Sequence, residues 1–204
     1  MIGIVDYGLG NLASVAGAVT KLGFQAEVTA DATRLAAADK LILPGVGAFG
    51  DGMKKLHERK LVAPLTDLVL AGKKPVLGIC LGFQLMAASS EEFGEHEGLG
   101  WVDAQVVRLA PEDQSMRVPH VGWNELHQIG DCILFDDVPS DALFYYVHSF
   151  RLAPANDNIV TGECDYGGRF TSAIQQGSVF GTQFHPEKSQ RHGLTVLQNF
   201  LEKA

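Results

Sequence analysis

The sequence predicts an α/β fold in which a single domain is built around a mixed, mostly parallel sheet flanked by helices. Three observations support this prediction. Strand-like and helix-like segments alternate through the first half, and shorter strand-like runs separated by turn residues follow. The run PVLGI at 75–79 is almost wholly apolar, which is typical of a strand buried on both faces of a sheet. At 204 residues with 46% hydrophobic side chains, the chain is long enough for one substantial core.

The first half alternates β-branched runs with segments whose apolar residues recur at helical spacing. The expected strands are Ile2–Asp6, Gln25–Thr29, Lys40–Pro44 and Pro75–Ile79. The expected helices are Leu12–Leu22, Ala32–Ala38, Gly52–Glu58, Leu61–Ala71 and a short one over Phe83–Ala88. Because helices separate successive strands, the strands are expected to pair in parallel, with helices on both faces in a flavodoxin-like arrangement.

After residue 100 the expected strands become short and follow one another without helices. They are Ala104–Arg108, Cys132–Phe135, Ala142–Phe150, Ile159–Glu163, Phe170–Gln175 and Val179–Phe184. Gly167-Gly168 and Gln176-Gly177 are typical of tight turns, so this half is expected to contain antiparallel hairpins. A last amphipathic helix is expected from about Gln190 to Glu202. No Pro/Ser-rich linker or repeat interrupts the chain, so residues 1–204 are interpreted as one domain.

Composition and charge argue against several classes of function. The 24 acidic residues outnumber the 16 basic ones, giving a formal net charge of −8, and no cluster of Lys and Arg offers a surface for nucleic acid. No run approaches the roughly 18 apolar residues that a membrane helix needs. The start lacks the basic region of a signal peptide, and three cysteines without a CxxC pair fit a reducing cytoplasm. We expect no nucleic-acid partner, no membrane segment, no metal and no cofactor.

Cys80 stands at the centre of Gly78-Ile79-Cys80-Leu81-Gly82, between a buried strand and a helix. This G-x-C-x-G pattern is the thiol version of a nucleophile elbow, a strained turn that raises a reactive side chain above the sheet. The N-terminal end of a helix favours a thiolate and offers N–H groups to an oxyanion. A lone cysteine is more often core filling, so the pattern alone leaves a nucleophile and a structural cysteine about equally open.

A cysteine nucleophile needs a base, and His185 stands out among seven histidines. It follows the expected strand Val179–Phe184 and precedes Pro186 and Glu187. A strand end and an elbow in one sheet can meet at the carboxyl edge, where α/β proteins bind ligands. Glu187 can point to the same side as His185 and fix its tautomer. His-Pro-Glu alone favours a surface turn, but together with the elbow a Cys–His–Glu triad is the better explanation.

Two glycine-rich turns carry weaker signals. Pro44-Gly45-Val46-Gly47 ends the third strand and can aim N–H groups at a developing negative charge, alongside the N–H of Leu81, or it can be a loop that only needs glycine conformations. The stretch GLGNLA at 8–13 matches the G-x-G-x-x-A form of the dinucleotide fingerprint. The acid expected about twenty residues later has only Glu27 and Asp31 as candidates, so a helix start is favoured over nucleotide binding.

Taken in order, PGVG, GICLGFQ and QFHPEKS resemble the oxyanion, nucleophile and His/Glu motifs of the class I (triad) glutamine amidotransferases. Within that family, longer segments resemble the glutaminase subunits of imidazole glycerol phosphate synthases, which serve histidine biosynthesis. These segments are IVDYGLGNLASV, PGVGAFGDGM, VPHVGWN, FYYVHSF and FHPEKSQ. The resemblance covers essentially the whole chain, and the order of the segments makes it highly specific.

The resemblance implies a chemistry for the triad. Cys80 would attack the side-chain amide of L-glutamine, His185 would carry a proton to the leaving ammonia, and Glu187 would orient His185. Water would then hydrolyse the glutamyl thioester and release glutamate. The backbone donors for the oxyanion would be those of Gly45, Val46, Gly47 and Leu81.

The same resemblance implies further binding residues. Gln84 would contact glutamine together with backbone around Ser149 and Phe150, and Glu92 is a weaker candidate for the substrate's ammonium group. A helix-solvating role for Gln84 and an ordinary strand role for Ser149 stay open. Phe83 and Phe150 stand where relatives often carry Met and Tyr. The absence of a tyrosine hydroxyl puts any role of that hydroxyl in doubt.

A partner is also implied. Ammonia would pass to a cyclase subunit, a (β/α)8 barrel that forms a heterodimer with this chain and acts on a phosphorylated ribulosyl substrate. Asn11, Trp123 and Lys188 match positions that face the barrel. Trp123 could be core, but its setting after Pro119-His120 favours a loop, and we place it at the interface. Two other hypotheses stay open: a different cysteine hydrolase or amidotransferase subunit, and an interaction protein that keeps the fold without turnover.

Overall fold

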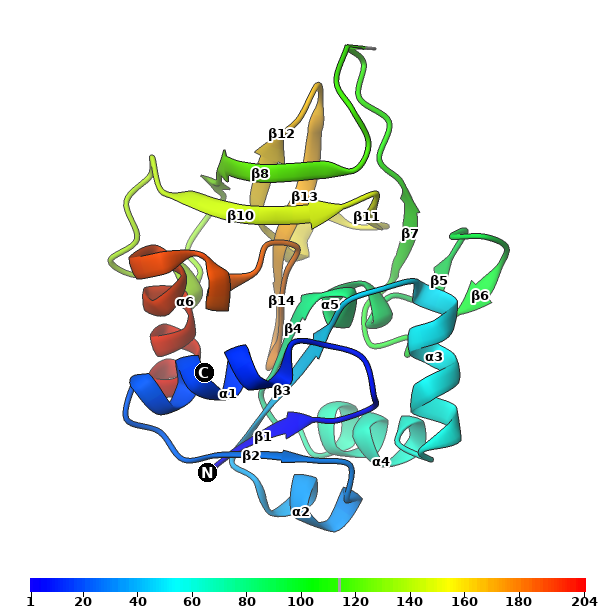
Figure 1. The fold of residues 1–204 in the computed structure, drawn as a ribbon, viewed down its shortest axis with the longest axis vertical. Helices are drawn as coiled ribbons and strands as arrows, with labels where there is room; N and C mark the ends of the chain where they lie inside the picture. The colour runs from blue at the N-terminus through cyan, green and yellow to red at the C-terminus, as the bar shows by residue number, and fades with distance from the viewer. Residues whose placement is uncertain (114) are drawn as a thin grey trace.

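The computed structural model describes residues 1–113 and 115–204. These residues form a twelve-stranded mixed sheet and a separate two-stranded sheet. The large sheet has the strand order β2-β1-β3-β4-β14-β13-β11-β7-β5-β6, with β12 beside β13 and β9. Helices cover both faces of its parallel part, and the two-stranded sheet of β8 and β10 lies at its other end (Figure 1). The predicted α/β class is confirmed.

The elements alternate in the first half and are rich in strands in the second. The strands are β1 Ile2–Val5, β2 Ala26–Thr29, β3 Lys40–Gly45, β4 Val76–Cys80, β5 Ser89–Ser90, β6 His96–Glu97, β7 Ala104–Arg108, β8 His120–Glu125, β9 His127–Gln128, β10 Leu143–His148, β11 Phe150–Pro154, β12 Val160–Asp165, β13 Arg169–Gln176 and β14 Val179–Thr182. The α-helices are α1 Leu12–Lys21, α2 Ala32–Ala37, α3 Phe49–Glu58, α4 Val62–Thr66, α5 Leu81–Leu85 and α6 Gln190–Lys203. Short helical turns are η1 Asp67–Ala71, η2 Ile133–Phe135, η3 Asp157–Ile159 and η4 Pro186–Lys188.

The parallel part of the large sheet is formed by β2, β1, β3, β4 and β14. β1 pairs in parallel with β2 and β3, and β4 pairs in parallel with β3 and β14. The register places Gly45 beside Cys80 on one side of β4 and Thr182 beside Ile79 on the other. The carboxyl ends of β3, β4 and β14 therefore meet at one edge of the sheet, as expected for Cys80 and the segment that follows β14.

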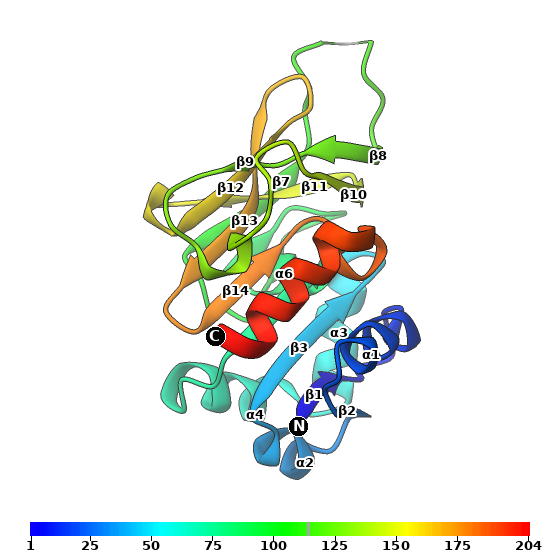
Figure 2. The same cartoon turned by 90° about the vertical axis from the view of Figure 1, so that its left-hand side faces the viewer.

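Two hydrophobic cores lie on opposite faces of this sheet. Figure 2 shows helix α6 in front of the sheet, on one of these faces. One contains side chains of α1 and α6, among them Val19 and Phe200, and the other contains side chains of α2, α3 and α4. Successive residues of β3 alternate between the cores, because side chains along a strand point to opposite faces. Each fully buried aliphatic side chain stabilises the fold by about 1.5–3 kcal/mol relative to exposure. This burial holds the strand ends of the site rigidly.

The strand expected at Cys132–Phe135 is wrong. The chain forms the 3₁₀ turn η2 there, with Leu134 and Phe135 buried. The side chain of Asn199 on α6 donates hydrogen bonds to the carbonyl oxygens of Leu134 (3.1 Å) and Asp136 (2.7 Å), which satisfies a helical turn. A short apolar run does not by itself distinguish a strand from a buried turn.

The loop expected around Trp123, after Pro119-His120, is also wrong, because His120–Glu125 forms strand β8. β8 pairs with β10 in antiparallel fashion, with Trp123 opposite Tyr145 and His120 opposite His148. The expected strand Ala142–Phe150 is divided between β10 and β11. The side chains of β8 do not follow the usual pattern of apolar residues inside and polar residues outside. A histidine and an asparagine lie on its inner face and a tryptophan lies on its outer face, so the sequence carries no clear strand signal.

Several local predictions are confirmed. Gly167, Gly168 and Gly177 have positive φ angles of 64°, 132° and 59°, and they connect β12–β13–β14 as antiparallel hairpins. At the first glycine-rich turn, the Asn11 side chain accepts a hydrogen bond from the Ser14 N–H and caps α1. Glu27, one of the acids considered for a nucleotide, is paired with Arg34. The turn therefore has a structural explanation as a helix start.

Phe83 and Gly181 form a close contact between α5 and β14. Phe83 is fully buried, and a Cβ atom added to Gly181 would lie 2.2 Å from Cδ2 of its ring. The large side chain at position 83 is thus accommodated by the absence of one at position 181. The ring is a rigid part of the core beneath the elbow helix.

We predict that Gly181→Ala and Gly17→Ala change stability in opposite directions. The first forces a methyl group into the Phe83 ring and should destabilise the protein by about 1–3 kcal/mol. Gly17 lies inside α1, and apart from its chain neighbours and the backbone of its own helix no atom lies within 4 Å of an added Cβ, so Ala should stabilise the helix by about 0.5–1 kcal/mol. Urea unfolding measures both, and a Gly181→Ala midpoint equal to that of the unsubstituted chain would contradict this packing.

Candidate active site

The turn at Cys80 has the geometry of a nucleophile elbow. Cys80 is the last residue of β4 and directly precedes α5, with φ 53° and ψ −107°. A non-glycine residue in this region is strained and is held there by its surroundings. A Cβ added to Gly82 would lie 1.8 Å from the Leu43 carbonyl oxygen, and one added to Gly78 would lie 2.8 Å from the backbone of Phe83. Both glycines of the motif are therefore required by close backbone contacts.

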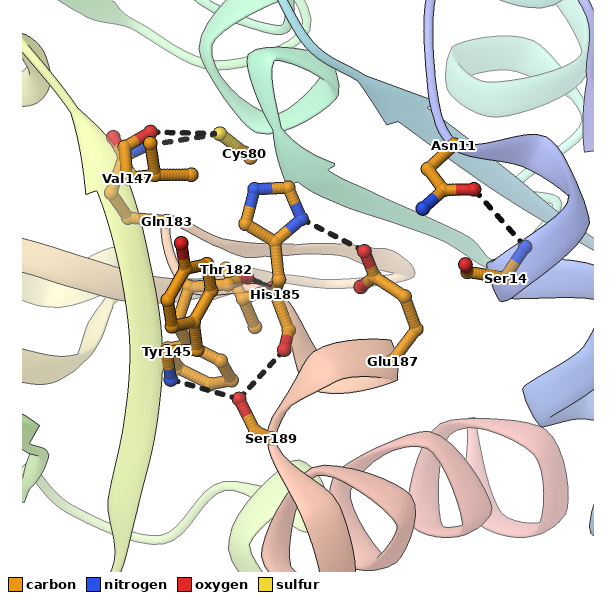
Figure 3. Close-up of polar contacts among 11 residues, drawn as sticks. Asn11, Ser14, Cys80, Tyr145, Val147, Thr182, Gln183, His185, Glu187 and Ser189 are labelled. Carbon is orange, nitrogen blue, oxygen red and sulfur yellow. Dashed lines mark hydrogen bonds and ion pairs between the residues drawn. The ribbon is translucent and has the colours of Figure 1, made fainter. Parts of the chain in front are cut away.

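The Cys80 thiol is nearly buried and lies between two polar groups (Figure 3). Its Sγ is 3.9 Å from the carbonyl oxygen of Val147, and the side-chain amide of Gln183 lies 3.8 Å from Sγ as a donor. Gln183 is fully buried just after β14. Gln183 was not predicted as a site residue, although it stands in the QFHPEKS motif, because a single glutamine in an apolar strand carries no spacing signal.

His185 and Glu187 form a buried pair. The imidazole Nδ1 lies 2.8 Å from the Glu187 Oε1, and both side chains are 2% exposed. The His185 backbone is fixed as well: its N–H donates to the Tyr145 carbonyl oxygen, and its own carbonyl accepts from the Ser189 hydroxyl. Tyr145 on β10 and Ser189, which follows the turn η4, thus hold the His185 backbone, and Figure 3 shows the other imidazole nitrogen turned toward Cys80.

The electrostatics of His185 favour the charged imidazolium. Burial alone would lower the pKa of His185, but Cys80 and Glu187 act in the other direction and raise the pKa to about 9. Among the described residues, its Nε2 has no hydrogen-bond partner although it is buried. An imidazole oriented through Nδ1 and open at Nε2 can take a proton from the thiol and stabilise a thiolate. Cys80, His185 and Glu187 therefore lie in the order of a thiol, a base and a carboxylate that orients the base.

A pocket of about 390 Å³ opens beside Cys80 and has the size of a small-molecule site. Its lining includes most of the residues predicted from the sequence for oxyanion and substrate binding. They are Val46, Gly47, Leu81, Gln84, Glu92, Ser149 and Phe150. Pro119, Val147 and His148 complete the lining. Segments from five separate parts of the chain are thus brought to one cavity.

Gln84 is buried and does not solvate its helix. Its side-chain amide donates to the Phe150 carbonyl oxygen at 2.8 Å and to the Gln183 Oε1 at 3.0 Å, and it is 5% exposed. The helix-solvating alternative is therefore wrong. Gln84 joins the elbow helix to β11 and to the residue that contacts the Cys80 sulfur.

Glu92 lies at the side of the pocket and contacts α3. Its Oε2 accepts a hydrogen bond of 2.7 Å from the N–H of Phe49, the first residue of that helix. Burial raises the pKa of this carboxyl group, which the hydrogen bond from Phe49 and the charge of His96 partly oppose. The carboxylate supplies negative charge at the cavity wall.

The glycine-rich turn after β3 lies against the elbow. Gly47 has φ 109°, and both Gly47 and the exposed Val46 line the pocket. Gly45 is buried behind them: an added Cβ would lie 2.2 Å from the Tyr7 Oη and 2.9 Å from the Gly82 nitrogen. Gly45 therefore permits the close approach of β3 and α5, and Val46 and Gly47 present backbone to the cavity.

The three residues assigned to an interface lie on exposed or half-exposed parts of the chain. Trp123 is 46% exposed on the outer face of β8, and its ring is 6.0 Å from that of Tyr145. The Lys188 ammonium lies 5.8 Å from the Tyr145 ring centre, and that ring is 6.4 Å from the imidazole of His185. Asn11 is the exposed cap of α1. An exposed aromatic surface therefore adjoins the triad.

Within residues 1–113 and 115–204, no helix is long and apolar enough to span a membrane. In the same residues, no three or more His, Cys, Asp or Glu side chains are grouped so that they could hold a metal ion.

Comparisons with known proteins agree on one family. The family model described as glutamine amidotransferase class-I matches residues 3–204. A protein of Rhodopirellula baltica named imidazole glycerol phosphate synthase subunit HisH is 46% identical over 200 residues, which is 98% of this chain and 96% of that protein. A protein of Sulfurimonas denitrificans with the same name is 45% identical over 204 residues, covering 99% of this chain and 98% of the relative.

Solved structures show the same fold at lower sequence identity. A crystal structure of a glutamine amidotransferase has a TM-score of 0.76 at 20% identity and covers 98% of this chain and 97% of its own. A chain in the structure of PurLQS from Thermotoga maritima also has a TM-score of 0.76 at 20% identity, with 98% and 96% covered. The architecture of sheet and helices is therefore shared beyond the closely similar sequences.

We predict that Glu187→Gln lowers the pKa of His185 from about 9. The carboxylate stabilises the imidazolium, so its neutral replacement should shift the protonation equilibrium toward neutral imidazole, and the charged fraction at pH 8 should fall. An NMR titration of the imidazole carbon shifts measures this. Glu58→Gln, which removes an exposed carboxylate on α3, is the matched control and should leave the titration unchanged. An unaltered pKa in Glu187→Gln would show that the pair is not electrostatically coupled.

Proposed function

This chain belongs to the class-I glutamine amidotransferases and, within them, to the HisH subunits of imidazole glycerol phosphate synthase, and on that basis we propose that it hydrolyses L-glutamine to glutamate and ammonia for histidine biosynthesis. The resemblance drawn from the motifs is confirmed by these relatives. The observation that carries the proposed chemistry is the Cys80 elbow beside the buried His185–Glu187 pair, at a pocket of amino-acid size. In this proposal residues 1–204 form one glutaminase domain that acts in the cytoplasm.

The proposed reaction proceeds through a thioester. The Cys80 thiolate forms a bond to the amide carbon of glutamine, and the carbonyl electron pair moves onto oxygen. When that pair returns, the carbon–nitrogen bond breaks and His185 Nε2 donates a proton to the departing ammonia. His185 then takes a proton from water, whose oxygen attacks the thioester, and the carbon–sulfur bond breaks to give glutamate. Glu187 holds the imidazole through Nδ1 in both halves of the reaction.

The oxyanion would be stabilised by backbone N–H groups around the elbow. Leu81 is the first residue of α5, so its N–H has no partner within the helix, and it lines the pocket beside Cys80. Val46 and Gly47 line the same pocket, and Gly45 packs closely against Leu81 and Gly82 of the elbow. One such donor typically contributes about 10²–10³-fold to the rate.

The remaining wall would bind the amino-acid part of glutamine. Glu92 offers a carboxylate for the substrate ammonium, and Gln84 holds the Ser149–Phe150 backbone in the pocket wall through the Phe150 carbonyl. The Phe150 ring packs edge-on against Phe93 with ring centres 6.3 Å apart. The contacts made by Phe150 use its backbone and its ring, so they are compatible with the absence of a tyrosine hydroxyl.

The proposed partner is a (β/α)8-barrel cyclase subunit that forms a heterodimer with this chain. The relatives' name describes a subunit of a synthase, which supports an assembly of more than one chain. The barrel would contact Trp123, Lys188 and Asn11. The exposed apolar side chains of Val121 on β8 and Leu143 on β10 would enlarge this surface. Ammonia released beside this surface would enter the partner without crossing bulk water.

We predict that Cys80→Ala abolishes glutamine-dependent synthesis by the complex with the cyclase and leaves synthesis from added ammonium chloride intact. The substitution removes the nucleophile, whereas the barrel needs only ammonia. Glutamate release and product formation are measured for the chain alone and in the complex. Activity should be low alone and strongly stimulated by the barrel with its ligand. Cys132→Ala removes another buried thiol, outside the pocket, and is the control.

Three results would overturn parts of this proposal. Glutamine hydrolysis that persists in Cys80→Ala would disprove the nucleophile. Stimulation that never occurs with the cyclase would disprove the assigned subunit, and fast hydrolysis by the chain alone would favour a different cysteine hydrolase. His185→Ala should reduce glutamine hydrolysis by about 10²–10⁴-fold, as for other positioned acid–base groups.

We predict that Trp123→Ala weakens binding of the cyclase subunit by roughly 30-fold, because a large aromatic at the centre of an interface commonly contributes about 2 kcal/mol. Leu70→Ala on η1 is a matched control, since Leu70 and Trp123 are each 46% exposed. Titration calorimetry measures both dissociation constants. If the two variants bind the cyclase subunit with equal affinity, Trp123 does not contribute to the interface.

A further inference from the structure

Two buried histidines that the proposed chemistry does not use join the pocket to the second sheet. His148 is the last residue of β10 and lines the pocket, and His120 is the first residue of β8. They are 6% and 2% exposed. The His148 Nδ1 lies 2.9 Å from the Phe150 carbonyl oxygen, and its Nε2 lies 3.1 Å from the His120 Nδ1. The two hydrogen-bonded rings, which we call the histidine chain, start at the pocket wall.

The hydrogen-bond partners at both ends of the histidine chain determine which ring nitrogen of each histidine carries the hydrogen. A carbonyl oxygen only accepts, so His148 carries its hydrogen on Nδ1 and donates to Phe150. The His148 Nε2 then accepts from the Nδ1–H of His120. The His120 Nε2 is left as an acceptor, and it faces the side-chain amide donor of Asn124 at 3.5 Å. That amide also donates to the Asp165 carbonyl oxygen at 2.8 Å.

This assignment requires both rings to be neutral, and their environment makes them so. Burial lowers the pKa of His120 to about 4. Burial is also the main cause that lowers the pKa of His148 to about 3; the hydrogen bond to the Phe150 carbonyl opposes this effect, and the charges of His120 and His185 add to it. At neutral pH each ring therefore carries one N–H hydrogen, and each hydrogen bond of the histidine chain has one donor and one acceptor.

Aromatic packing prevents the His120 ring from turning. It stacks on Tyr146 with ring centres 4.9 Å apart and on Tyr166 with centres 4.0 Å apart. Both tyrosines are held by their hydroxyl groups: that of Tyr146 pairs with the Ser172 hydroxyl, and that of Tyr166 donates to the Arg117 carbonyl oxygen. The histidine chain is therefore rigid at its His120 end, which is distant from the pocket. It can consequently fix the Phe150 carbonyl at its other end.

We propose that His120 and His148 are positioning residues that fix the Phe150 carbonyl, and with it the Ser149–Phe150 backbone that glutamine contacts. The proposal deepens the proposed function and rests on it. The Phe150 carbonyl receives two donors, Gln84 from the elbow helix and His148 from β10, so both of its lone-pair directions are used. The Ser149 carbonyl is likewise held by the Leu109 N–H. The orientation of this wall is thus determined before substrate binds.

Gln84 directs one of its two amide hydrogens at the Phe150 carbonyl and the other at Gln183. Without His148, rotation of the Phe150 peptide would therefore be opposed by a single hydrogen bond to this carbonyl. Loss of one hydrogen bond of this kind costs about 0.5–1.5 kcal/mol, so the affinity for glutamine should fall by about 3- to 10-fold. The chemical step at Cys80 would be affected less, since the triad is held by β10 and η4 through other contacts.

The first test is the tautomer of the two rings in the unsubstituted full chain. Nitrogen-15 NMR of histidine-labelled protein at pH 7 should show both rings neutral with hydrogen on Nδ1. In His120→Phe, which keeps a stacked ring but removes the donor, His148 should show hydrogen on Nε2 in part of the population. A native His148 with hydrogen on Nε2 would overturn the proposal, whatever the activity of the protein.

The second test separates a donor from simple packing at position 148. His148→Asn keeps an amide donor near the place of Nδ1, and His148→Leu has nearly the same shape without a donor. In the complex with the cyclase, Leu should raise the KM for glutamine by about 3- to 10-fold with a smaller change in kcat, and Asn should recover much of that loss. Equal KM values for Leu and Asn, or a loss confined to kcat, would overturn the proposal.

Two controls distinguish the failure of this proposal from that of the proposed function. His57→Leu replaces an exposed histidine on α3 that lies outside the pocket lining, and it should keep the native KM. Synthesis from ammonium chloride should be unchanged in all variants, because it does not use the pocket. An unsubstituted chain that fails to hydrolyse glutamine would disprove the glutaminase itself, whereas an active His148→Leu variant with native KM would disprove only the positioning role.

Discussion

The strained turn at Cys80 is the constraint on which the rest of the site depends. Its positive φ is sustained because Gly82 approaches the Leu43 carbonyl more closely than any side chain would allow. That contact requires β3, β4 and α5 to be packed in one register, and the pairing of Gly45 with Cys80 provides it. The buried cores on both faces of the sheet stabilise this arrangement. Much of the hydrophobic stability of the parallel half therefore serves to hold one thiol at the carboxyl edge.

Around this turn, the polar groups form a connected set. Gln183 approaches the Cys80 sulfur and accepts from Gln84, which donates in turn to the Phe150 carbonyl. His148 supplies the second hydrogen bond to that carbonyl oxygen. Buried polar groups are costly when unpaired, so each member of such a set restricts the rotamers of the next. The cavity wall is consequently preorganised by hydrogen bonds that approach it from α5, β10 and the segment after β14.

The sequence was informative where local chemistry decides the structure. Alternation of strands and helices, the glycines around Cys80 and the turn at Gly167-Gly168 each have a local physical cause, and each was predicted. Cys132–Phe135 was not, because the Asn199 side chain that satisfies its helical turn lies on α6, far along the chain. His120, His148 and Gln183 were not selected as site residues for a related reason: their partners are distant in sequence, and a single polar residue in an apolar strand has no periodic signal.

Strand β8 connects the proposed interface to the pocket through the alternation of its side chains. His120 and Asn124 point inward into the histidine chain, whereas Val121 and Trp123 are exposed on the outer face. Its neighbour β10 repeats the pattern, with His148 inside and Tyr145 half-buried beside Lys188. A rigid strand pair cannot shift its outer face without shifting its inner face. A partner that binds Trp123 therefore acts on the same backbone that carries His120, and a change there reaches the Phe150 carbonyl through two hydrogen bonds.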